Sequence, residues 1–409
     1  MSNRPGLPRS FKLIILATFV ARTGFFVESF LTIFMKMQAG FSPGLAAFIM
    51  ALYGFGGAGA VFLSGPLIDR FGPRRLLLAS LLATAATAGV LALGPPDWSL
   101  AILVLLMGVV GQVIMPATNA FVAHTVPPQR QREGFSWVFI ALNSGLALGP
   151  LIGGRLAGVS FPVMFGTGAA LLVLGAVMAA LAKRTPDAAE VPRARTAPRL
   201  AGLRVLLQDG VFRRYILLNW LFMGLYLQVF VILPLLMLDD GLTPQDYGVV
   251  MAVNGTALVL LQLPVDRALS RFGGARLLSV AALLLAVGLL GNTFANTVWW
   301  YLAAAVFWTA AELINMPLAT SVTAGLSTPQ LRGSYLAIHG MAFPLGMGMA
   351  SLVGGSAFAL LPQPKLIWPV LAVIGVLLAI LRFRGEAALQ ARIAAAPSGA
   401  AAREAVEES

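Results

Sequence analysis

Long apolar stretches alternate with short polar ones along almost the whole chain. Twelve of them are rich in Ala, Gly, Leu and Val, and each is long enough to cross a hydrocarbon layer of about 30 Å as a helix. They fall at 12–36, 45–67, 76–94, 98–123, 134–158, 161–182, 214–238, 246–268, 275–295, 297–325, 334–359 and 366–384. Because an open chain satisfies its backbone in lipid by forming helices, the pattern predicts an all-α membrane protein with twelve transmembrane helices.

The second half of the chain repeats the first at a constant offset, so the chain contains two copies of one six-helix unit. The matched segments are Gly40-Phe-Ser-Pro43 with Gly241-Leu-Thr-Pro244, Arg70-Phe-Gly72 with Arg271-Phe-Gly273, and Met115-Pro116 with Met316-Pro317. Duplicated halves in so apolar a chain are typical of secondary transporters, whose substrate site lies between the halves.

Polar segments divide the chain into four parts. The segment 183–213 is rich in Arg, Pro and Ala and separates six predicted helices from six. We therefore predict an N-terminal half at 1–182, a cytoplasmic linker at 183–213 and a C-terminal half at 214–384. The Ala-rich residues 385–409 are predicted to form a frayed or disordered cytoplasmic tail.

Composition and charge agree with a membrane protein and give its orientation. Hydrophobic residues make up 58% and charged residues 11%, mean hydropathy is +0.86, and the net charge is +12. Of the 28 Lys and Arg, only Lys36, Arg155 and Lys365 fall in segments on the side opposite the N-terminus. By the positive-inside rule, both termini are predicted to be cytoplasmic, in a multi-pass protein of the inner membrane. The positive charge therefore indicates contact with membrane lipid rather than nucleic acid.

The loop after the second predicted helix carries a motif of glycines and charges. It reads Gly65-Pro-Leu-Ile-Asp69-Arg70-Phe-Gly72-Pro-Arg74-Arg75, where Gly65 permits close helix contact and Gly72 a tight turn. This resembles the G-x-x-x-D-R-x-G-R-R signature of the major facilitator superfamily, departing from it by Pro73. The resemblance implies the twelve-helix major facilitator fold and an inner gate in which the aspartate and arginine stabilise the outward-open state. Ser270 replaces the aspartate in the second half, so we expect its gate to differ in strength.

The fifth predicted helix carries a row of small residues. Gly145-Leu-Ala-Leu-Gly149-Pro150-Leu-Ile-Gly153-Gly154 follows Arg132 and Asn143. Small residues at i, i+4 and i+8 give one flat face for close helix packing, and Pro150 bends the helix. The run resembles the G-x-x-x-G-P-x-x-G-G motif of the superfamily's drug/proton antiporters, which implies efflux; helix packing alone is the alternative. On this basis we expect Gly149→Leu to abolish transport and Gly149→Ala to be tolerated.

Three ionisable side chains stand out inside the apolar stretches, where each costs about 2.5–3.5 kcal/mol unless it faces protein or water. Arg22 and Glu28 lie in the first predicted helix, where a direct pair would be strained, and Glu312 lies midway along the tenth. Burial favours a neutral acid and a nearby arginine favours its anion, so such an acid can load and release a proton. We assign all three to proton coupling and expect Arg22 to meet Glu312 across the cavity. The alternatives are an interhelical lock, or for Arg22 a contact with an anionic substrate.

Polar residues on the helices expected to line the cavity are candidates for substrate contact, with interhelical hydrogen bonds as the alternative. They are Gln112, Asn119, Tyr226, Gln228, Asn254, Trp308 and Asn315. The sequence has no Walker loop and no cluster with metal-ligand spacing, so we expect no cofactor and no metal. The proton gradient is then the expected energy source.

These features favour a transporter over an enzyme, because the sequence offers no arrangement of nucleophile and base. We expect a monomer that moves a small-molecule substrate against protons, by proton-coupled efflux of small lipophilic compounds with alternating access. Proton-coupled or facilitative transport of a specific metabolite, such as a sugar or an organic acid, is the alternative within transport. A non-transporting scaffold or receptor is the alternative of another class, although it has no reason to bury charges such as Glu312.

Overall fold

The computed structural model describes residues 9–126, 130–182, 208–269, 272–327 and 331–394. Within these ranges the chain is almost entirely helical and contains no strand. Twelve helical spans are long and apolar enough to cross a membrane. The predicted fold class is therefore confirmed.

The helices of the two halves are continuous or broken once within the membrane. The N-terminal half contains α1 (Arg9–Gly24), α2 (Phe26–Met37), α3 (Pro43–Phe71), α4 (Pro73–Ala92), α5 (Asp97–Gly111), α6 (Ile114–Thr125), α7 (Gln131–Val159) and α8 (Phe161–Leu181). The C-terminal half contains α10 (Gly210–Tyr226), α11 (Gln228–Asp239), α12 (Pro244–Leu269), α13 (Gly274–Phe294), α14 (Val298–Leu326), α15 (Arg332–Gly340), α16 (Ala342–Leu360) and α17 (Ile367–Arg384), followed by α18 (Glu386–Ala394).

Four membrane spans consist of two helices each, a feature that the apolar pattern did not predict. The pairs are α1 with α2, α5 with α6, α10 with α11, and α15 with α16. At the first break, the amide of Phe25 donates to the carbonyl of Arg22 at 3.2 Å, and the amide of Glu28 donates to that of Phe25 at 3.1 Å. These tighter three-residue hydrogen bonds interrupt the α-helical pattern between Arg22 and Glu28.

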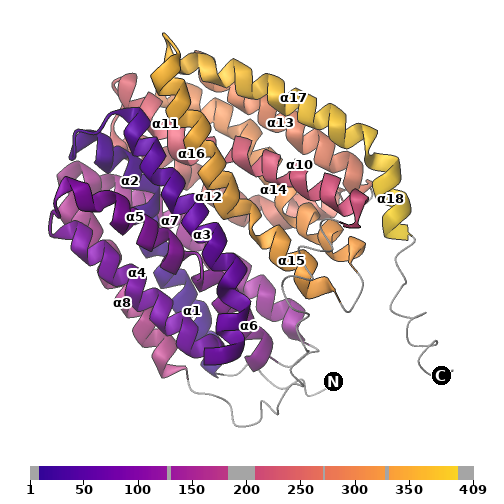
Figure 1. Cartoon of the computed structure of the whole chain (residues 1–409), viewed down its shortest axis with the longest axis horizontal. Helices are drawn as coiled ribbons and strands as arrows, with labels where there is room; N and C mark the ends of the chain where they lie inside the picture. The colour runs from indigo at the N-terminus through magenta and orange to yellow at the C-terminus, as the bar shows by residue number, and fades with distance from the viewer. Residues whose placement is uncertain (1–8, 127–129, 183–207, 270–271, 328–330, 395–409) are drawn as a thin grey trace.

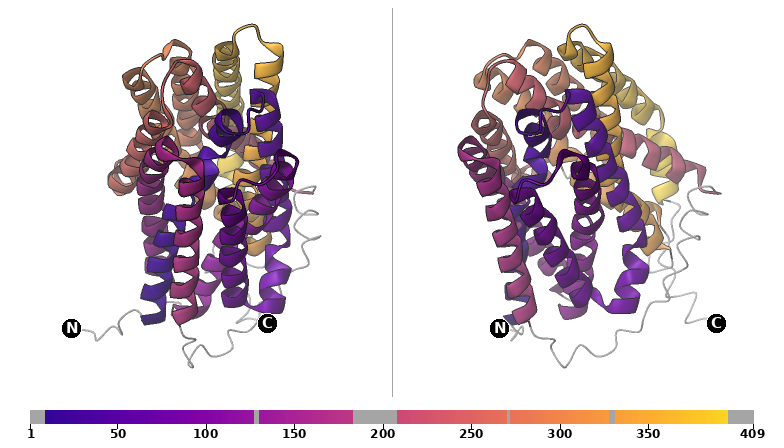
Figure 2. Two further views of the ribbon diagram at one scale, coloured as in Figure 1. Left: turned by 90° about the vertical axis from the view of Figure 1, so that its left-hand side faces the viewer. Right: turned by 60° about the vertical axis from the view of Figure 1, so that its left-hand side comes forward.

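The connections between spans gather at two opposite ends of the bundle. We call the end that carries Gly72 and Leu181 the linker face, because the linker joins the halves there, and the other end, with 38–42 and 240–243, the far face. Figure 1 shows the N-terminal half in indigo to magenta beside the C-terminal half in red through orange to yellow. Helix α3 packs along α16, and α7 packs along α12, so two helix pairs join the halves. Figure 2 shows both halves extending along a common direction.

The halves are joined mainly toward the far face. The largest core cluster takes side chains from both halves, whereas toward the linker face each half has a cluster of its own. Near the far face, the rings of Phe30 and Tyr247 meet edge to face at 5.6 Å between centroids. Lys36 and Asp239 form a salt bridge between the ends of α2 and α11. The structure is therefore closed at the far face, and the halves separate toward the linker face.

Two glycines related by the sequence repeat let the halves approach closely. A Cβ atom on Gly54 of α3 would lie 2.2 Å from the backbone nitrogen of Gly348 in α16. A Cβ atom on Gly255 of α12 would lie 2.6 Å from the Cα atom of Ala147 in α7. Because optimal carbon–carbon contacts are about 3.5–4.0 Å, both positions require glycine for this packing.

The expectation that residues 385–409 form a disordered tail is wrong for 386–394, which form α18. Leu389 of this helix is buried in the core cluster around Phe212 and Tyr335. Arg392 forms a salt bridge with Asp209 at 3.3 Å. Apolar burial and this ion pair order a segment whose composition alone indicated disorder, while 395–409 lie outside the described residues.

Candidate functional site

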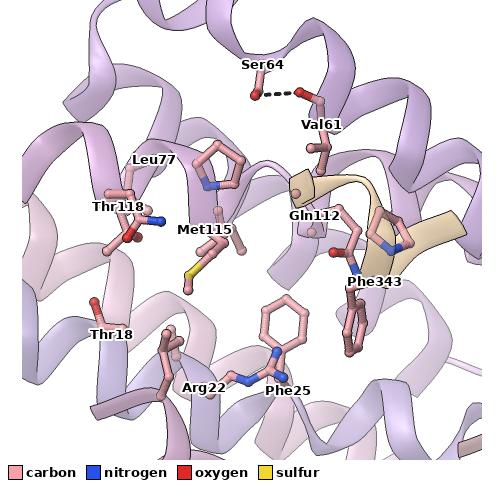
Figure 3. Close-up of a pocket in the computed structure, with 18 of the residues that line it drawn as sticks. Thr18, Arg22, Phe25, Val61, Ser64, Leu77, Gln112, Met115, Thr118 and Phe343 are labelled. Atoms are coloured by element: carbon pink, nitrogen blue, oxygen red, sulfur yellow. Dashed lines mark hydrogen bonds between the residues drawn. The ribbon is translucent and has the colours of Figure 1, made fainter. Parts of the chain in front are cut away.

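A cavity of about 530 Å³ lies between the halves on the linker-face side, and we call it the central cavity. Its wall is formed by α1, α3, α4, the junction of α5 and α6, α7, and the span of α15 and α16. Figure 3 shows side chains from both halves pointing into it, including Arg22, Gln112 and Phe343. Most of the wall is apolar, as in small-molecule binding sites generally.

Arg22 is the charged group of this cavity. It extends from α1 over the ring of Phe25, with the guanidinium carbon 5.3 Å from the ring centroid. No other described residue in the cavity wall carries a formal charge. Within the described part of the chain, Arg22 forms no salt bridge. A cation without a bound carboxylate in an apolar cavity attracts anionic or acceptor groups.

Glu28 lies just beyond the central cavity, in the first turn of α2, and is 7% exposed. The hydroxyl of Tyr53 hydrogen-bonds to its carboxylate and accepts a hydrogen bond from Gln112 Nε2 at 3.0 Å. Arg22 attracts the carboxylate electrostatically without reaching salt-bridge distance. Glu28 Oε1 is buried and has no hydrogen-bond partner among the described residues.

A small cavity lies beside Glu28 and shares part of its wall with the central cavity. It measures about 10 Å³, close to the space that one water needs, and Glu28, Ser29 and Pro150 help to line it. Arg22 and Phe343 line both this small cavity and the central one. The small cavity therefore adjoins both Glu28, whose Oε1 has no partner among the described residues, and the wall of the central cavity, and it has about the space of one water.

Glu312 has a different environment, inside the C-terminal half. Tyr226 Oη donates to its Oε2 at 2.6 Å, and Asn254 Nδ2 donates to the same oxygen at 3.0 Å. Asn254 Nδ2 also donates to Thr309 Oγ1 at 3.0 Å, and Trp308 packs against the Tyr226 ring with centroids 6.4 Å apart. These contacts tie α10, α12 and α14 together, which favours the interpretation of Glu312 as an interhelical lock.

The structure does not bring Arg22 and Glu312 together, so the expected contact between them is absent from it. Arg22 lies over Phe25 in the N-terminal half, whereas Glu312 faces Tyr226 and Asn254 in the C-terminal half. Both residues lie near the middle of their spans, as their sequence positions indicate. Depth alone does not decide which way a side chain points, and α14 does not contribute to the wall of the central cavity.

The remaining candidates for the cavity wall behave differently in the two halves of the protein. Gln112 and Asn119 line the central cavity, where they were expected, and so does Asn143 of the α7 motif. The C-terminal candidates do not line it and are at most 1% exposed: Tyr226, Gln228, Asn254, Trp308 and Asn315. Tyr226, Asn254 and Asn315 donate to groups of the same half. The placement of all five in the cavity is therefore wrong for this arrangement of the halves.

Two further polar residues were missed by the sequence analysis. Tyr53 links Gln112 to Glu28. The sequence carries no signal for this role, because a tyrosine in an apolar stretch is usually an ordinary core residue. Arg382 was counted among the linker-face charges, yet it is 8% exposed. Its Nη1 donates to the carbonyl of Leu278 at 2.8 Å and to Asn315 Oδ1 at 3.0 Å. Arg382 therefore holds α17 against α13 and α14.

The loop between α3 and α4 has the expected turn. Gly72 adopts a φ of +81°, a conformation that favours glycine and that a tight turn here requires. Gly65 lines the central cavity, and Arg74 donates to the carbonyl of Ala180 at the end of α8. Asp69, Arg70 and Arg75 are exposed at the linker face. Ser270, the second-half counterpart of Asp69, lies outside the described residues.

The small residues of α7 face two neighbouring helices. A Cβ atom on Gly145, Gly149 or Gly153 would lie 2.7–2.9 Å from atoms of 22–26, where α1 gives way to α2. A Cβ atom on Gly154 would lie 2.9 Å from the carbonyl oxygen of Pro244 in α12. This row therefore packs α7 against the segment that carries Arg22 and Glu28. The side chain of Arg132 lies outside the described residues.

Comparison with known proteins identifies the family. The family model described as Major Facilitator Superfamily matches residues 14–243 and 226–405. The chain belongs to the Major Facilitator Superfamily. This facilitator-superfamily chain is an integral, multi-pass membrane protein and a transporter rather than an enzyme.

Relatives of this facilitator-superfamily transporter include the multidrug resistance protein MdtH. MdtH of Salmonella newport (strain SL254) is 26% identical over 365 residues, which cover 86% of this chain and 88% of MdtH. MdtH of Salmonella typhimurium (strain LT2) matches with the same values.

Solved structures of other transporters share the fold of this facilitator-superfamily chain. A POT family transporter in complex with a thioalcohol-conjugated peptide has a TM-score of 0.82 and 14% identity, and the match covers 93% of this chain and 97% of that one. The nucleoside transporter NupG has a TM-score of 0.77 and 14% identity, and the match covers 92% of this chain and 100% of NupG. At such low identities the likeness concerns the fold alone.

Proposed function

We propose that this transporter exports small lipophilic compounds in exchange for protons, by alternating access through the central cavity. The apolar cavity wall, the similarity to MdtH and the α7 motif support export of lipophilic compounds. The observation that carries proton coupling is the position of Glu28, a buried acid one water-sized space away from a cavity that is closed at the far face.

Glu28 is the stronger candidate for the coupling acid, and Glu312 the weaker one. Protonation of Glu28 changes the charge beside Arg22, the one formal charge of the described cavity wall, and therefore changes the field that a substrate meets. Glu312 accepts two hydrogen bonds inside the C-terminal half and lies away from the cavity. We therefore assign proton coupling to Glu28 and Arg22, and a locking role to Glu312.

A second candidate function follows from the charge of Arg22, namely cotransport of an organic acid with a proton. An anionic substrate bound to Arg22 weakens the attraction between Arg22 and ionised Glu28, and so favours the protonated form of Glu28. Anion and proton then bind together. A lipophilic cation instead favours ionised Glu28, so cation and proton compete, as exchange requires.

The sign of proton movement on substrate binding therefore separates the two functions. Purified protein in weakly buffered detergent solution is titrated with three compounds that share one aryl skeleton: a carboxylate, the primary amide and the corresponding amine. They supply an anion, a neutral compound and a cation, and the pH of the solution is followed. Export by exchange predicts proton release with the compound that binds best, and cotransport predicts proton uptake with the carboxylate. Glu28→Gln should abolish either signal, and Glu312→Gln serves as the control buried acid. A signal that persists in Glu28→Gln would reject Glu28 as the coupling acid.

We further propose that the protein works as a monomer in the cytoplasmic membrane, with both termini in the cytoplasm and without a cofactor or metal. The excess of Lys and Arg on the linker side supports this orientation. The chain has no cysteine, so an introduced cysteine is the one thiol that a maleimide can label in the protein. In intact cells, an impermeant maleimide should label Gln38→Cys at the far face but not Arg75→Cys at the linker face. The reverse pattern would invert the proposed orientation.

A further inference from the structure

A third cavity lies in the C-terminal half at the linker face, apart from the central cavity. It measures about 230 Å³ and is enclosed by α10, α13, α17 and α18, so we call it the α18 cavity. Apolar side chains form most of its wall, among them Leu218, Leu278, Leu381 and Leu389. Figure 1 shows α18 following α17 beside the start of α10.

The wall of the α18 cavity carries two arginines. Arg214 and Arg382 both line it, and no acidic residue is among the described residues of its wall. Neither arginine forms a salt bridge within the described part of the chain. The adjacent carboxylate of Asp209 is already engaged by Arg392 and Tyr335. Two positive charges are therefore left without a carboxylate at an apolar pocket.

The cavity lies beside surface that faces lipid. Leu381, which lines it, is 42% exposed, and Leu217 and Phe383 on the same two helices are 50% and 60% exposed. Exposed apolar side chains on membrane-spanning helices contact acyl chains. The α18 cavity also lies where α10 begins and α17 ends, at the level at which lipid headgroups meet the protein.

We propose that the α18 cavity binds one anionic phospholipid. The phosphate of the headgroup lies against Arg214 and Arg382, and the first part of one acyl chain lies among the leucines of the wall. Arginine presents a planar set of donors that suits phosphate oxygens, and basic pockets between transmembrane helices hold anionic headgroups. Free phosphate would satisfy the arginines but would leave the apolar wall uncovered. A bound lipid would touch α10, α17 and α18 at once and so hold α18 in place.

Binding to the purified full-length protein tests this site, with native mass spectrometry as the readout. The probes are phosphatidylglycerol and phosphatidylcholine with identical acyl chains, and inorganic phosphate as a competitor. Arg214→Gln removes one charge, and Arg384→Gln removes a charge that does not line the cavity. Ala388→Trp fills the cavity from an exposed position on α18, and Ala387→Trp adds the same bulk outside it.

We expect the first phosphatidylglycerol to bind at least 5-fold more tightly than phosphatidylcholine. Arg214→Gln and Ala388→Trp should remove this preference, whereas Arg384→Gln and Ala387→Trp should keep it. Phosphate at 100-fold excess over lipid should not displace phosphatidylglycerol; displacement would indicate a phosphate site instead. Equal binding of the two lipids, or a preference that survives both cavity variants, would overturn the proposal.

Discussion

Replacing Gly54 by alanine should open the far face. In the structure, α3 and α16 approach so closely at this glycine that an added Cβ would lie 2.2 Å from Gly348 N, 2.6 Å from its Cα and 2.8 Å from the carbonyl oxygen of Pro344. All three atoms belong to the backbone of the other half, so no side-chain rotation relieves the clash. The helices must move apart by about 1 Å or more to reach an ordinary contact of about 3.5 Å.

The magnitude follows from the cost of overpacking, which is about 1–3 kcal/mol for a well-packed site. This cost applies to the arrangement that is closed at the far face, because rocking of the halves separates α3 and α16 there. An alternative arrangement that is open at the far face avoids it. The ratio of far-face-open to far-face-closed molecules should therefore rise by about 5- to 150-fold.

Distance measurement between spin labels checks this expectation. Cysteines replace Gln38 at the end of α2 and Gln363 between α16 and α17, both exposed and on opposite halves of the far face. Gly59→Ala is the matched control, because it lies on the same helix and a Cβ there meets no atom within 4 Å. Gly54→Ala should populate longer distances, and Gly59→Ala should leave the distribution as in the parent. Identical distributions for both variants would refute the assigned role of Gly54.

Three other expectations concern the gates and the packing of α7. Lys36→Met breaks the Lys36–Asp239 salt bridge and should raise the ratio of far-face-open to far-face-closed molecules by less than about 5-fold. The side chains are 22% and 45% exposed, and such exposed pairs contribute about 0.2–1 kcal/mol. A double variant with the two charges exchanged should restore the parent distances. The structure revises the expectation that Gly149→Ala is tolerated: its Cβ would lie 2.8 Å from the carbonyl oxygen of Thr23, so this variant should lower transport, measured as initial rate in proteoliposomes. Full activity would show that α1 shifts without cost. Asp69→Asn should increase maleimide labelling of a cysteine on the linker-face side of the central cavity, and unchanged labelling would contradict an inner-gate role.

The sequence predicts the arrangement in the membrane well because lipid imposes a simple rule. Each span must be long, apolar and helical, so helix positions follow from composition with small differences at their ends. Gly54 and Gly255, which occupy equivalent places in the two copies of the repeat, both lie at close contacts between the halves. Gly72 needs its positive φ, which the motif spacing already indicated.

The direction in which polar side chains point was beyond the sequence. Arg22 and Glu312 have similar depth, yet one faces the cavity and the other a neighbouring helix of its own half. Asn119 and Asn254 both lie within similar apolar stretches of sequence. Asn119 nevertheless lies in the cavity wall, and Asn254 lies in the core of the C-terminal half. The apolar pattern around such residues has little periodicity, because lipid and protein interior are both apolar. Only packing distinguishes the cavity wall from the helix interface.

The helix breaks and α18 were missed for related reasons. The break at Phe25 lacks a proline, and the polar residues on either side of it, Arg22 and Glu28, were interpreted as functional groups within one helix, so the break was not predicted. Helix α18 depends on a contact between Leu389 and residues far earlier in the chain, such as Phe212. Such long-range packing does not show in the composition of the segment itself.

The central claim, that Glu28 couples proton movement to substrate movement, is tested most directly by Glu28→Gln in proteoliposomes. Glutamine keeps the size of the acid but fixes a neutral form. The account predicts that this variant still exchanges substrate down its own gradient, yet does not concentrate it when a pH gradient is imposed, whereas Glu312→Gln still does. Concentrative, pH-driven transport by Glu28→Gln would contradict the account.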